Sequence, residues 1–266
     1  MSVVHVNGVD LYYEERGAGE PIVCIHGTSS SAAVWGDAVA ELAKHGRTIS
    51  YDRRGCFRSE RPEPYVTDVH QHADDAAALI EALDAAPAIV IGRSYGGETA
   101  IDLALRYPER VRALALLEAA VLSMSEEAAR WGSALGKTVF AAAEEDMSTV
   151  AETFLRAVAG DEAWEAFPEP VKQMFTANGP AIVAELRGGT LDVDKDLLGS
   201  IGQPTLIVGG KDSPPAFVEV TNAMADAMPS AKVEWVEGGH LINPAHPAVL
   251  RFVDDVLAAA SFDRRT

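Results

Sequence analysis

A serine between two glycines is the feature of this chain that points most directly to chemistry. Residues 88–97 read AIVIGRSYGG, an apolar run that leads through Gly92, Ser94 and Gly96 into a helical pattern. A serine at a tight turn between a strand and a helix adopts a strained backbone that projects its hydroxyl out of the sheet, and glycines leave room for such a turn. The start of the helix offers free N–H groups to an oxyanion. The pattern therefore predicts a serine nucleophile rather than an ordinary connection.

Ser94 needs a base, because a hydroxyl is a poor nucleophile at neutral pH until its proton is removed. Histidine suits this role, since its pKa of about 6.5 allows proton transfer in both directions. Of the seven histidines, only His240 follows two glycines directly after an apolar run, where it can reach the turn at Ser94. His70 and His72 have a spacing that metal sites also use, but they stand beside acids at the start of a helical pattern. We interpret them as a surface pair and predict no metal site.

The elements that must position these residues alternate along the chain. Short runs rich in Val and Ile predict strands buried on both faces, at 22–25, 48–51, 88–91, 111–117, 205–208 and 232–236. Asn7-Gly8 between residues 3–6 and 9–14 predicts a β-hairpin. Helical patterns lie at 32–44, 68–83, 94–106, 215–227 and 247–260. This alternation predicts an α/β fold with a mostly parallel sheet.

Residues 123–200 interrupt the alternation. They contain no convincing strand and carry helical patterns rich in Ala and Glu, with several Trp and Phe residues. We expect a helical cap here, and a core made of residues 1–122 and 201–266. A cap over the carboxyl ends of the strands would form a lid on the crevice where such sheets bind ligands. The alternative is additional scaffold, with the aromatic residues as its own core.

With these motifs the chain resembles the serine-nucleophile α/β-hydrolases that carry an inserted cap, of the esterase or lactonase type. The resemblance covers nearly the whole chain outside the cap. It implies an eight-stranded, mostly parallel sheet flanked by helices, with the cap between strands six and seven. His26-Gly27 and Gly238-Gly239-His240 stand where the family places an oxyanion donor and the base. The implied oxyanion hole consists of the backbone N–H groups of Thr28 and Tyr95.

A loop motif also carries the resemblance. Residues 51–59 read YDRRGCFRS, which is similar to the family's D-x-R-G-x-G-x-S loop. The chain departs from that pattern at Phe57, where glycine is usual. We therefore expect this loop to be stiffer than usual or to face the pocket.

Two acids compete to orient His240 and stabilise its charged form. Asp212 follows the strand at 205–208, which is the usual family position, although Asp, Ser and Pro at 212–214 are also typical of a helix start. Glu118 ends the strand at 111–117, and its placement resembles that of fungal lactonases that open zearalenone-like macrolactones. The sequence alone leaves both candidates open, with Asp212 preferred.

The expected activity is cofactor-free cleavage of a small, largely apolar carboxylic ester or lactone through an acyl-enzyme. Aromatic residues of the cap favour an apolar pocket. The candidate lining residues are Trp35, Phe57, Trp131, Trp164, Met174 and Phe175. Two alternatives remain: a carbon–carbon bond hydrolase or perhydrolase that uses the same serine and histidine, and a ligand-binding signalling module with weak hydrolysis.

Composition excludes other classes of protein. The 266 residues include 22 Lys and Arg against 40 Asp and Glu, for a net charge of −18. Nucleic acids and anionic membranes bind basic surfaces, so neither is an expected partner. Two cysteines without a CxxC motif predict neither a disulfide framework nor a zinc site. The first residues lack the pattern of a secretory signal. We expect a cytoplasmic monomer or homodimer.

Overall fold

An eight-stranded sheet forms the centre of the molecule. The computed structural model describes residues 2–263. The strands are β1 (Ser2–Val6), β2 (Val9–Arg16), β3 (Pro21–Ile25), β4 (Arg47–Tyr51), β5 (Ala88–Arg93), β6 (Val111–Leu117), β7 (Thr205–Gly210) and β8 (Lys232–Val236). Their order across the sheet is β1-β2-β4-β3-β5-β6-β7-β8. The pairs β1–β2 and β2–β4 are antiparallel, and all other pairs are parallel, which confirms the predicted fold class.

The predicted hairpin is present at the amino terminus. Asn7 and Gly8 both have positive φ angles, of 49° and 72°, as the tight turn between β1 and β2 requires. In the following strand β3, Val23 and Ile25 belong to one buried cluster, while Ile22 and Cys24 belong to another. Alternate residues of a strand point to opposite faces, so these two clusters are the two sides of a sheet covered on both faces.

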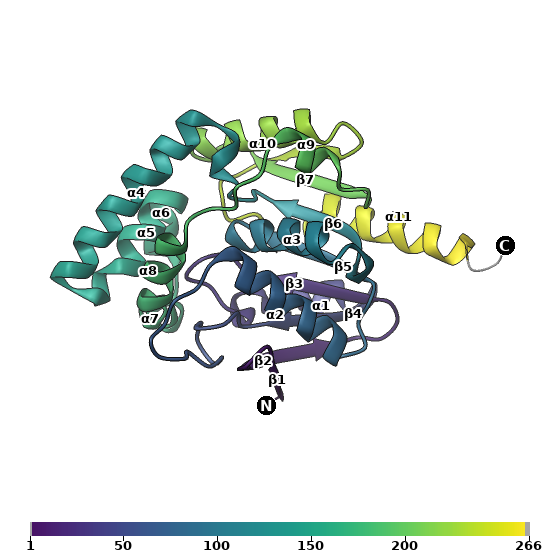
Figure 1. Cartoon of the computed structure of the whole chain (residues 1–266), viewed down its shortest axis with the longest axis horizontal. Helices are drawn as coiled ribbons and strands as arrows, with labels where there is room; N and C mark the ends of the chain where they lie inside the picture. Colours follow the sequence, from purple (N-terminus) through teal and green to yellow (C-terminus); the bar gives the residue numbers. More distant parts are fainter. Residues whose placement is uncertain (1, 264–266) are drawn as a thin grey trace.

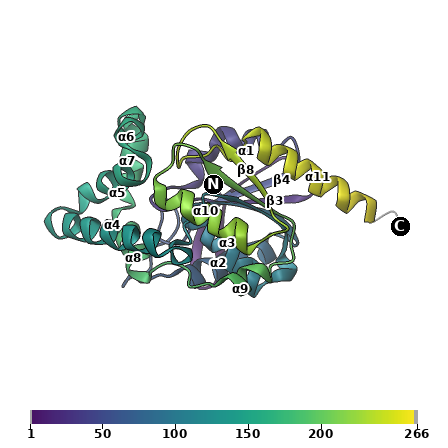
Figure 2. The same cartoon turned by 90° about the horizontal axis from the view of Figure 1, so that it is seen from above.

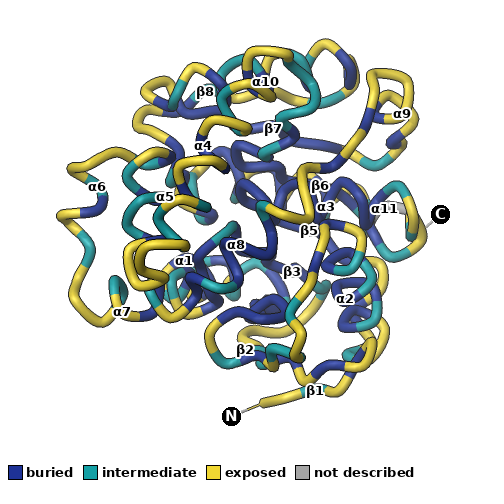
Figure 3. Tube along the Cα trace, turned by 60° about the vertical axis from the view of Figure 1, so that its left-hand side comes forward, coloured by how far each residue is buried: buried dark blue, intermediate teal, exposed yellow. Residues whose placement is uncertain are grey.

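Helices cover both faces of the sheet. In Figure 2, α2 (Val69–Ala82), α3 (Tyr95–Arg106) and α10 (Pro215–Ala227) lie on one side, and α1 (Gly36–Leu42) and α11 (Pro247–Asp263) lie on the other. Short 3₁₀ turns precede α1 at Ala32–Trp35 and β6 at Pro108–Arg110. Figure 3 shows the central strands β3, β5 and β6 as mostly buried, and every residue of β5 is buried. The carboxyl ends of the central parallel strands are therefore held in place by the core, and they position the loops that follow them.

A group of helices separates β6 from β7 in the chain. It consists of α4 (Glu126–Glu145), α5 (Val150–Ala159), α6 (Asp161–Ala166), α7 (Glu169–Ala177), α8 (Gly179–Gly188) and α9 (Lys195–Gly199), with 3₁₀ turns at Leu122–Met124 and Met147–Thr149. Helices α4 to α8 stand beside the sheet in Figure 1 and share an apolar cluster, which Phe217 of α10 joins. By contrast, Leu191, Val193 and Leu198 belong to the apolar core between the sheet and the helices α2, α3 and α10. The end of the segment predicted as a cap thus packs on the core.

Among residues 2–263, no helix is both long enough and apolar enough to cross a membrane.

Candidate active site

Ser94 lies at the sharp turn between β5 and α3. Its φ and ψ angles are 55° and −122°, a conformation that non-glycine residues rarely adopt. Gly92 and Gly96 make the turn possible, because a Cβ atom on Gly92 would stand 2.3 Å from the carbonyl oxygen of Gly96. Ser94 itself is held by its backbone, whose N–H donates to the carbonyl oxygen of Leu117 at 3.0 Å. The strained turn fixes the direction of the hydroxyl relative to the sheet.

The loop after β3 packs directly against Ser94. A Cβ atom on Gly27 would lie 3.1 Å from the Cβ of Ser94, so a larger residue here would have to displace its neighbours slightly. His26 braces this loop: its Nε2 accepts from the N–H of Arg53 at 2.9 Å, and its Nδ1 is 2.8 Å from the carbonyl oxygen of Gly27. Because Nε2 is the acceptor, the proton lies on Nδ1. Burial and the Arg53 guanidinium hold the pKa of His26 well below its ordinary value, so the neutral ring persists.

His240 forms a buried pair with Glu118. Its Nδ1 lies 2.8 Å from Oε2 of Glu118, which follows β6 with a φ of 47°. The other carboxylate oxygen, Oε1, accepts from the N–H of Gly210 at 2.7 Å. Both side chains are almost fully buried. Each oxygen of the carboxylate therefore has a hydrogen-bond partner, as burial of a charge requires. Because Nδ1 of His240 bonds to Glu118, Nε2 is the ring nitrogen that remains available.

Asp212 lies on the surface near this pair, and no hydrogen bond joins it to His240. Its side chain is exposed and accepts only the N–H of Gly238, at 3.2 Å, while its own N–H donates back to the carbonyl oxygen of Gly238 at 3.0 Å. These bonds brace the loop before His240. The geometry thus favours Glu118 as the acid that orients His240. The sequence-based preference was for Asp212.

Phe217 packs against His240 and was missed by the sequence analysis. The ring centroids are 3.9 Å apart, and Phe217 also meets Trp131 edge-on at 5.5 Å. Phe217 comes from the first turns of α10. The sequence signal for Phe217 is its place at the start of the helix that directly follows the loop with Asp212. The contact limits the orientations open to the imidazole.

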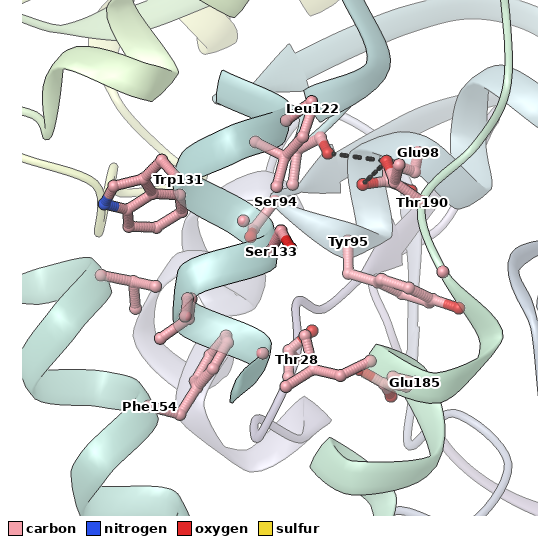
Figure 4. A pocket seen from close by; sticks show the side chains of 18 of the residues that line it. Thr28, Ser94, Tyr95, Glu98, Leu122, Trp131, Ser133, Phe154, Glu185 and Thr190 are labelled. Atoms are coloured by element: carbon pink, nitrogen blue, oxygen red, sulfur yellow. Dashed lines mark hydrogen bonds between the residues drawn. The ribbon is translucent and has the colours of Figure 1, made fainter. Parts of the chain in front are cut away.

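Two cavities meet at Ser94. The larger has a volume of about 470 Å³ and extends under α4, α5 and α8, while the smaller, of about 190 Å³, contains His240. Thr28, Ser94, Phe154 and Val158 line both. Figure 4 shows Ser94 and Thr28 beside Phe154, a residue of the inserted helices. Residues of the inserted helices therefore line the cavities at Ser94, and their action as a lid stays a prediction.

Only part of the predicted lining is present. Trp131 lines the larger cavity and Phe175 the smaller. The other four predicted residues line neither cavity. Trp35 is buried between the sheet and α1, and Trp164 and Met174 belong to the apolar cluster of the inserted helices. Phe57 is 45% exposed. Those three buried residues pack within the protein, and Phe57 faces solvent.

Phe57 keeps the backbone that the usual glycine would have, with a φ of 43°. Its N–H donates to the Oδ1 of Asn178 at 2.8 Å. The side-chain Nδ2 of Asn178 also reaches the loop after β3, where it donates to the carbonyl oxygens of Ser29 at 3.1 Å and Ser30 at 3.0 Å. Asn178 lies between α7 and α8 and is fully buried. One side chain of the inserted helices thus ties together two loops of the sheet.

Thr28 and Tyr95, whose N–H groups are predicted to form an oxyanion hole, line the same cavity as Ser94, and their role stays a prediction. Thr28 follows Gly27, and Tyr95 is the first residue of α3, so its N–H lies at a helix start with no earlier turn to accept it. Both residues line the larger cavity together with Ser94. Two N–H groups at this position can receive the negative oxygen of a tetrahedral intermediate.

Comparison with known proteins identifies the family of the fold. The sequence model of the alpha/beta hydrolase fold family matches residues 20–247. The chain is 29% identical over 259 residues to pimeloyl-(acyl-carrier protein) methyl ester esterase of Nitrosospira multiformis, covering 94% of this chain and 96% of that protein. It is 26% identical over 276 residues to 2-hydroxy-6-oxo-2,4-heptadienoate hydrolase of Pseudomonas putida, covering 97% and 96%. A thermophilic esterase from Thermogutta terrifontis superposes with a TM-score of 0.76, at 25% identity, over 100% of this chain and 99% of that chain.

Proposed function

Because the chain belongs to the alpha/beta hydrolase fold family, we propose that it is a serine hydrolase that cleaves a carboxylic ester or a lactone through an acyl-enzyme. The comparisons support a hydrolase in general, since the relatives include an esterase and a hydrolase of a dienoate. The ester or lactone, the serine mechanism and the roles of single residues are our proposal.

The observation that carries the proposal is the buried pair of His240 and Glu118 beside Ser94. The hydrogen bond between Nδ1 of His240 and Oε2 of Glu118 fixes the tautomer in which Nε2 is free to accept a proton. His240 and Ser94 line the same cavity of about 190 Å³. This arrangement matches the chemical need of a serine nucleophile, which is a base held in one orientation by an acid.

In the proposed mechanism, the Nε2 of His240 takes the proton of the Ser94 hydroxyl as its oxygen attacks the carbonyl carbon. The carbonyl oxygen becomes an anion that the N–H groups of Thr28 and Tyr95 stabilise. His240 then gives its proton to the leaving oxygen, and the acyl group stays on Ser94. Water, activated by the same histidine, releases the acid and restores the serine. Glu118 stabilises the charged imidazole in both halves of the cycle.

We propose that the two cavities receive the two parts of an ester. The leaving oxygen must lie near His240, because it receives the proton from that residue. His240 lines the smaller cavity only, so the leaving alcohol belongs in about 190 Å³ and the acyl group in about 470 Å³. We therefore expect short alcohols, such as methanol or ethanol, joined to larger acyl groups.

The test is hydrolysis of methyl esters of medium-chain acids, followed by release of acid. We expect turnover that is abolished in Ser94→Ala, and covalent labelling of Ser94 by a fluorophosphonate, located by peptide mass spectrometry. Turnover that survives Ser94→Ala would overturn the proposal. Tight binding of esters to both forms with negligible turnover would instead support the signalling module.

A second candidate is cleavage of a carbon–carbon bond. It is favoured by the similarity to 2-hydroxy-6-oxo-2,4-heptadienoate hydrolase. Loss of the dienoate chromophore of that compound, without hydrolysis of methyl esters, would select this reaction. Formation of a peracid from hydrogen peroxide and a carboxylic acid would select a perhydrolase.

A further inference from the structure

Arg93, the residue before Ser94, carries a buried positive charge that the proposed mechanism does not use. Its exposed fraction is 8%. Burial lowers the pKa of its guanidinium to about 10, and no carboxylate among residues 2–263 offsets that effect, so the group stays charged at neutral pH. Burying a charge is costly unless an opposite charge or hydrogen bonds compensate for it. The position of Arg93 therefore calls for an explanation.

A comparison with the buried Arg54 shows what Arg93 lacks. The Nε and Nη2 of Arg54 donate to the two carboxylate oxygens of Asp75, at 2.8 and 2.6 Å. Arg93 instead donates one long hydrogen bond, from Nη1 to the carbonyl oxygen of Ile242 at 3.4 Å. Its Nε and Nη2 have no partner in the described chain, and neither is among the fully inaccessible unpartnered atoms of that chain, so both border open space. The edge with which Arg54 holds a carboxylate is thus free in Arg93.

The guanidinium of Arg93 lies at the boundary between the smaller cavity and a groove on the surface. It bonds to Ile242 and lies 5.6 Å from the centroid of the Trp35 ring. The chain neighbours of these two residues, Leu241 and Val34, line the smaller cavity together with Arg93. Val34 and Arg93 also line the groove, which has a volume of about 350 Å³. The free nitrogens are therefore close to the space that the proposed function gives to the leaving alcohol.

The charges around Arg93 favour an anion as its ligand. Of the described residues that line the smaller cavity, Arg93 is the one with a permanent charge, and none is acidic. Glu118 bonds to His240 but does not line this cavity. Asp37 lines the groove, yet it is exposed to solvent and does not offset the charge of Arg93. A carboxylate in the smaller cavity would therefore meet an unpaired cation and no competing acid.

Resting on the proposed function, we propose that Arg93 binds a carboxylate on the leaving part of the substrate. The two carboxylate oxygens accept from the free Nε and Nη2, in the two-pronged geometry that a guanidinium offers. The leaving alcohol is then a short hydroxy acid, such as glycolate or lactate. The acyl group still lies in the larger cavity, and the reaction at Ser94 is unchanged.

The test compares three esters of octanoic acid that differ only in the alcohol. They are carboxymethyl, carbamoylmethyl and ethyl octanoate, and the carbamoylmethyl ester is a neutral counterpart of nearly the same shape as the carboxymethyl ester. In the wild type we expect kcat/KM for the carboxymethyl ester to exceed that for both neutral esters by about tenfold to hundredfold, the range expected for a hydrogen bond to a charged group. A ratio at or below one overturns the subsite.

Two variants of Arg93 separate its charge from its role in packing. Arg93→Gln removes the charge, and Arg93→Lys keeps the charge without the two-pronged geometry. We expect the preference for the carboxymethyl ester to disappear in Arg93→Gln and to persist at reduced size in Arg93→Lys, with the ratio taken inside one variant so that losses of folded protein cancel. Val34→Ala, on the wall of the same cavity, is the control and should alter all three esters together. An equal loss for every ester in Arg93→Gln, with the wild-type ratio kept, would mean that Arg93 only supports the fold.

Equilibrium binding separates this inference from the proposed function. Calorimetry with Ser94→Ala, and with the double variant that adds Arg93→Gln, measures the affinity for the carboxymethyl and carbamoylmethyl esters in the absence of turnover. Tighter binding of the carboxymethyl ester that depends on Arg93 supports the subsite even if the wild type cleaves no ester. Hydrolysis without any such difference in binding leaves the serine hydrolase standing and overturns the subsite.

A free carboxylate that enters through the surface groove is the other source of the same chemistry. Glycolate distinguishes the two sources, because in the smaller cavity it occupies the place of the leaving alcohol. We expect saturating glycolate to weaken the binding of carboxymethyl octanoate to Ser94→Ala. Glycolate that binds through Arg93 without weakening the binding of the ester would place the anion in the groove and overturn the subsite.

Discussion

Replacing Glu118 with glutamine tests the pairing of His240 with almost no change in shape. A glutamine amide would donate to Nδ1 of His240 and so drive the ring proton to Nε2, where it blocks acceptance of the Ser94 proton. We expect kcat to fall by roughly 10³- to 10⁴-fold, as for other triads in which the tautomer is wrong. Steady-state kinetics on a methyl ester measures the loss, and circular dichroism checks that the fold is kept.

Asp212→Asn is the matched control at the same scale. The side chain is exposed and accepts a single N–H from Gly238, which the oxygen of asparagine also accepts. We expect kcat to change less than about tenfold, well below the loss from a wrong tautomer. A large loss in Asp212→Asn together with a small one in Glu118→Gln would return the role to Asp212.

The sequence could predict where Ser94 and His240 lie, but not which acid faces the histidine. Ser94 is defined by a local motif, and His240 by glycines close after a strand. Both Glu118 and Asp212 follow the ends of neighbouring parallel strands, so both are near the same edge. The difference arises from the left-handed backbone of Glu118 and from the N–H of Gly210 that receives its carboxylate. Neither can be read from residue types.

At the scale of elements, Asn178 links the inserted helices to the loop after β3, at the two residues that follow Thr28. We expect Asn178→Ala to lower kcat roughly tenfold to hundredfold, because the loss of its bonds to Ser29 and Ser30 loosens the loop that aims the Thr28 N–H, and one such donor is worth about 3 kcal/mol. KM should change much less, since the cavity walls remain. Kinetics well below the melting temperature measures this split.

Ser125→Ala separates positioning from simple loss of stability. Ser125 caps α4 by accepting the N–H of Ala128 at 3.3 Å, and its hydroxyl donates to the Oε2 of Glu219 in α10; it is far from the loop at Thr28 in the chain. Its removal should destabilise the protein by about 1 kcal/mol and leave kcat nearly as it is. If Asn178→Ala proves no slower than Ser125→Ala at equal loss of stability, Asn178 has only a structural role.

The elements themselves were largely predictable, because strands buried on both faces leave short continuous apolar runs. The predicted bounds of β6, β8 and α10 agree with the structure, and the remaining strands differ by at most two residues at an end. The cavity lining was not predictable in the same way. Periodicity indicates that Trp164 and Met174 face something apolar, but not whether that is a cavity or other helices. They pack within the inserted helices instead.

For the whole molecule, burial of Glu98 links stability to pH. In the unfolded chain this carboxyl has its ordinary pKa of 4.5, and in the folded protein burial raises the pKa to about 8. Between these values the unfolded chain has released the proton while the folded protein still holds it. Stability from this residue is therefore full below pH 4.5 and is lost as the pH rises towards 8, with a slope of at most about 1.4 kcal/mol per pH unit.

Glu98→Gln removes this dependence and keeps the hydrogen bonds. A glutamine can accept the N–H of Leu191 with its oxygen, and its nitrogen can donate to the hydroxyl of Thr190 when that hydroxyl donates to the carbonyl oxygen of Ala120 instead. We expect the difference in unfolding free energy between variant and wild type to grow in favour of the variant from pH 5 to pH 8 and then to level off. Urea unfolding of both proteins at several pH values measures it.

The net charge of −18 contributes to both curves and nearly cancels in their difference. A difference that stays constant with pH would mean that Glu98 is already ionised in the folded protein at neutral pH.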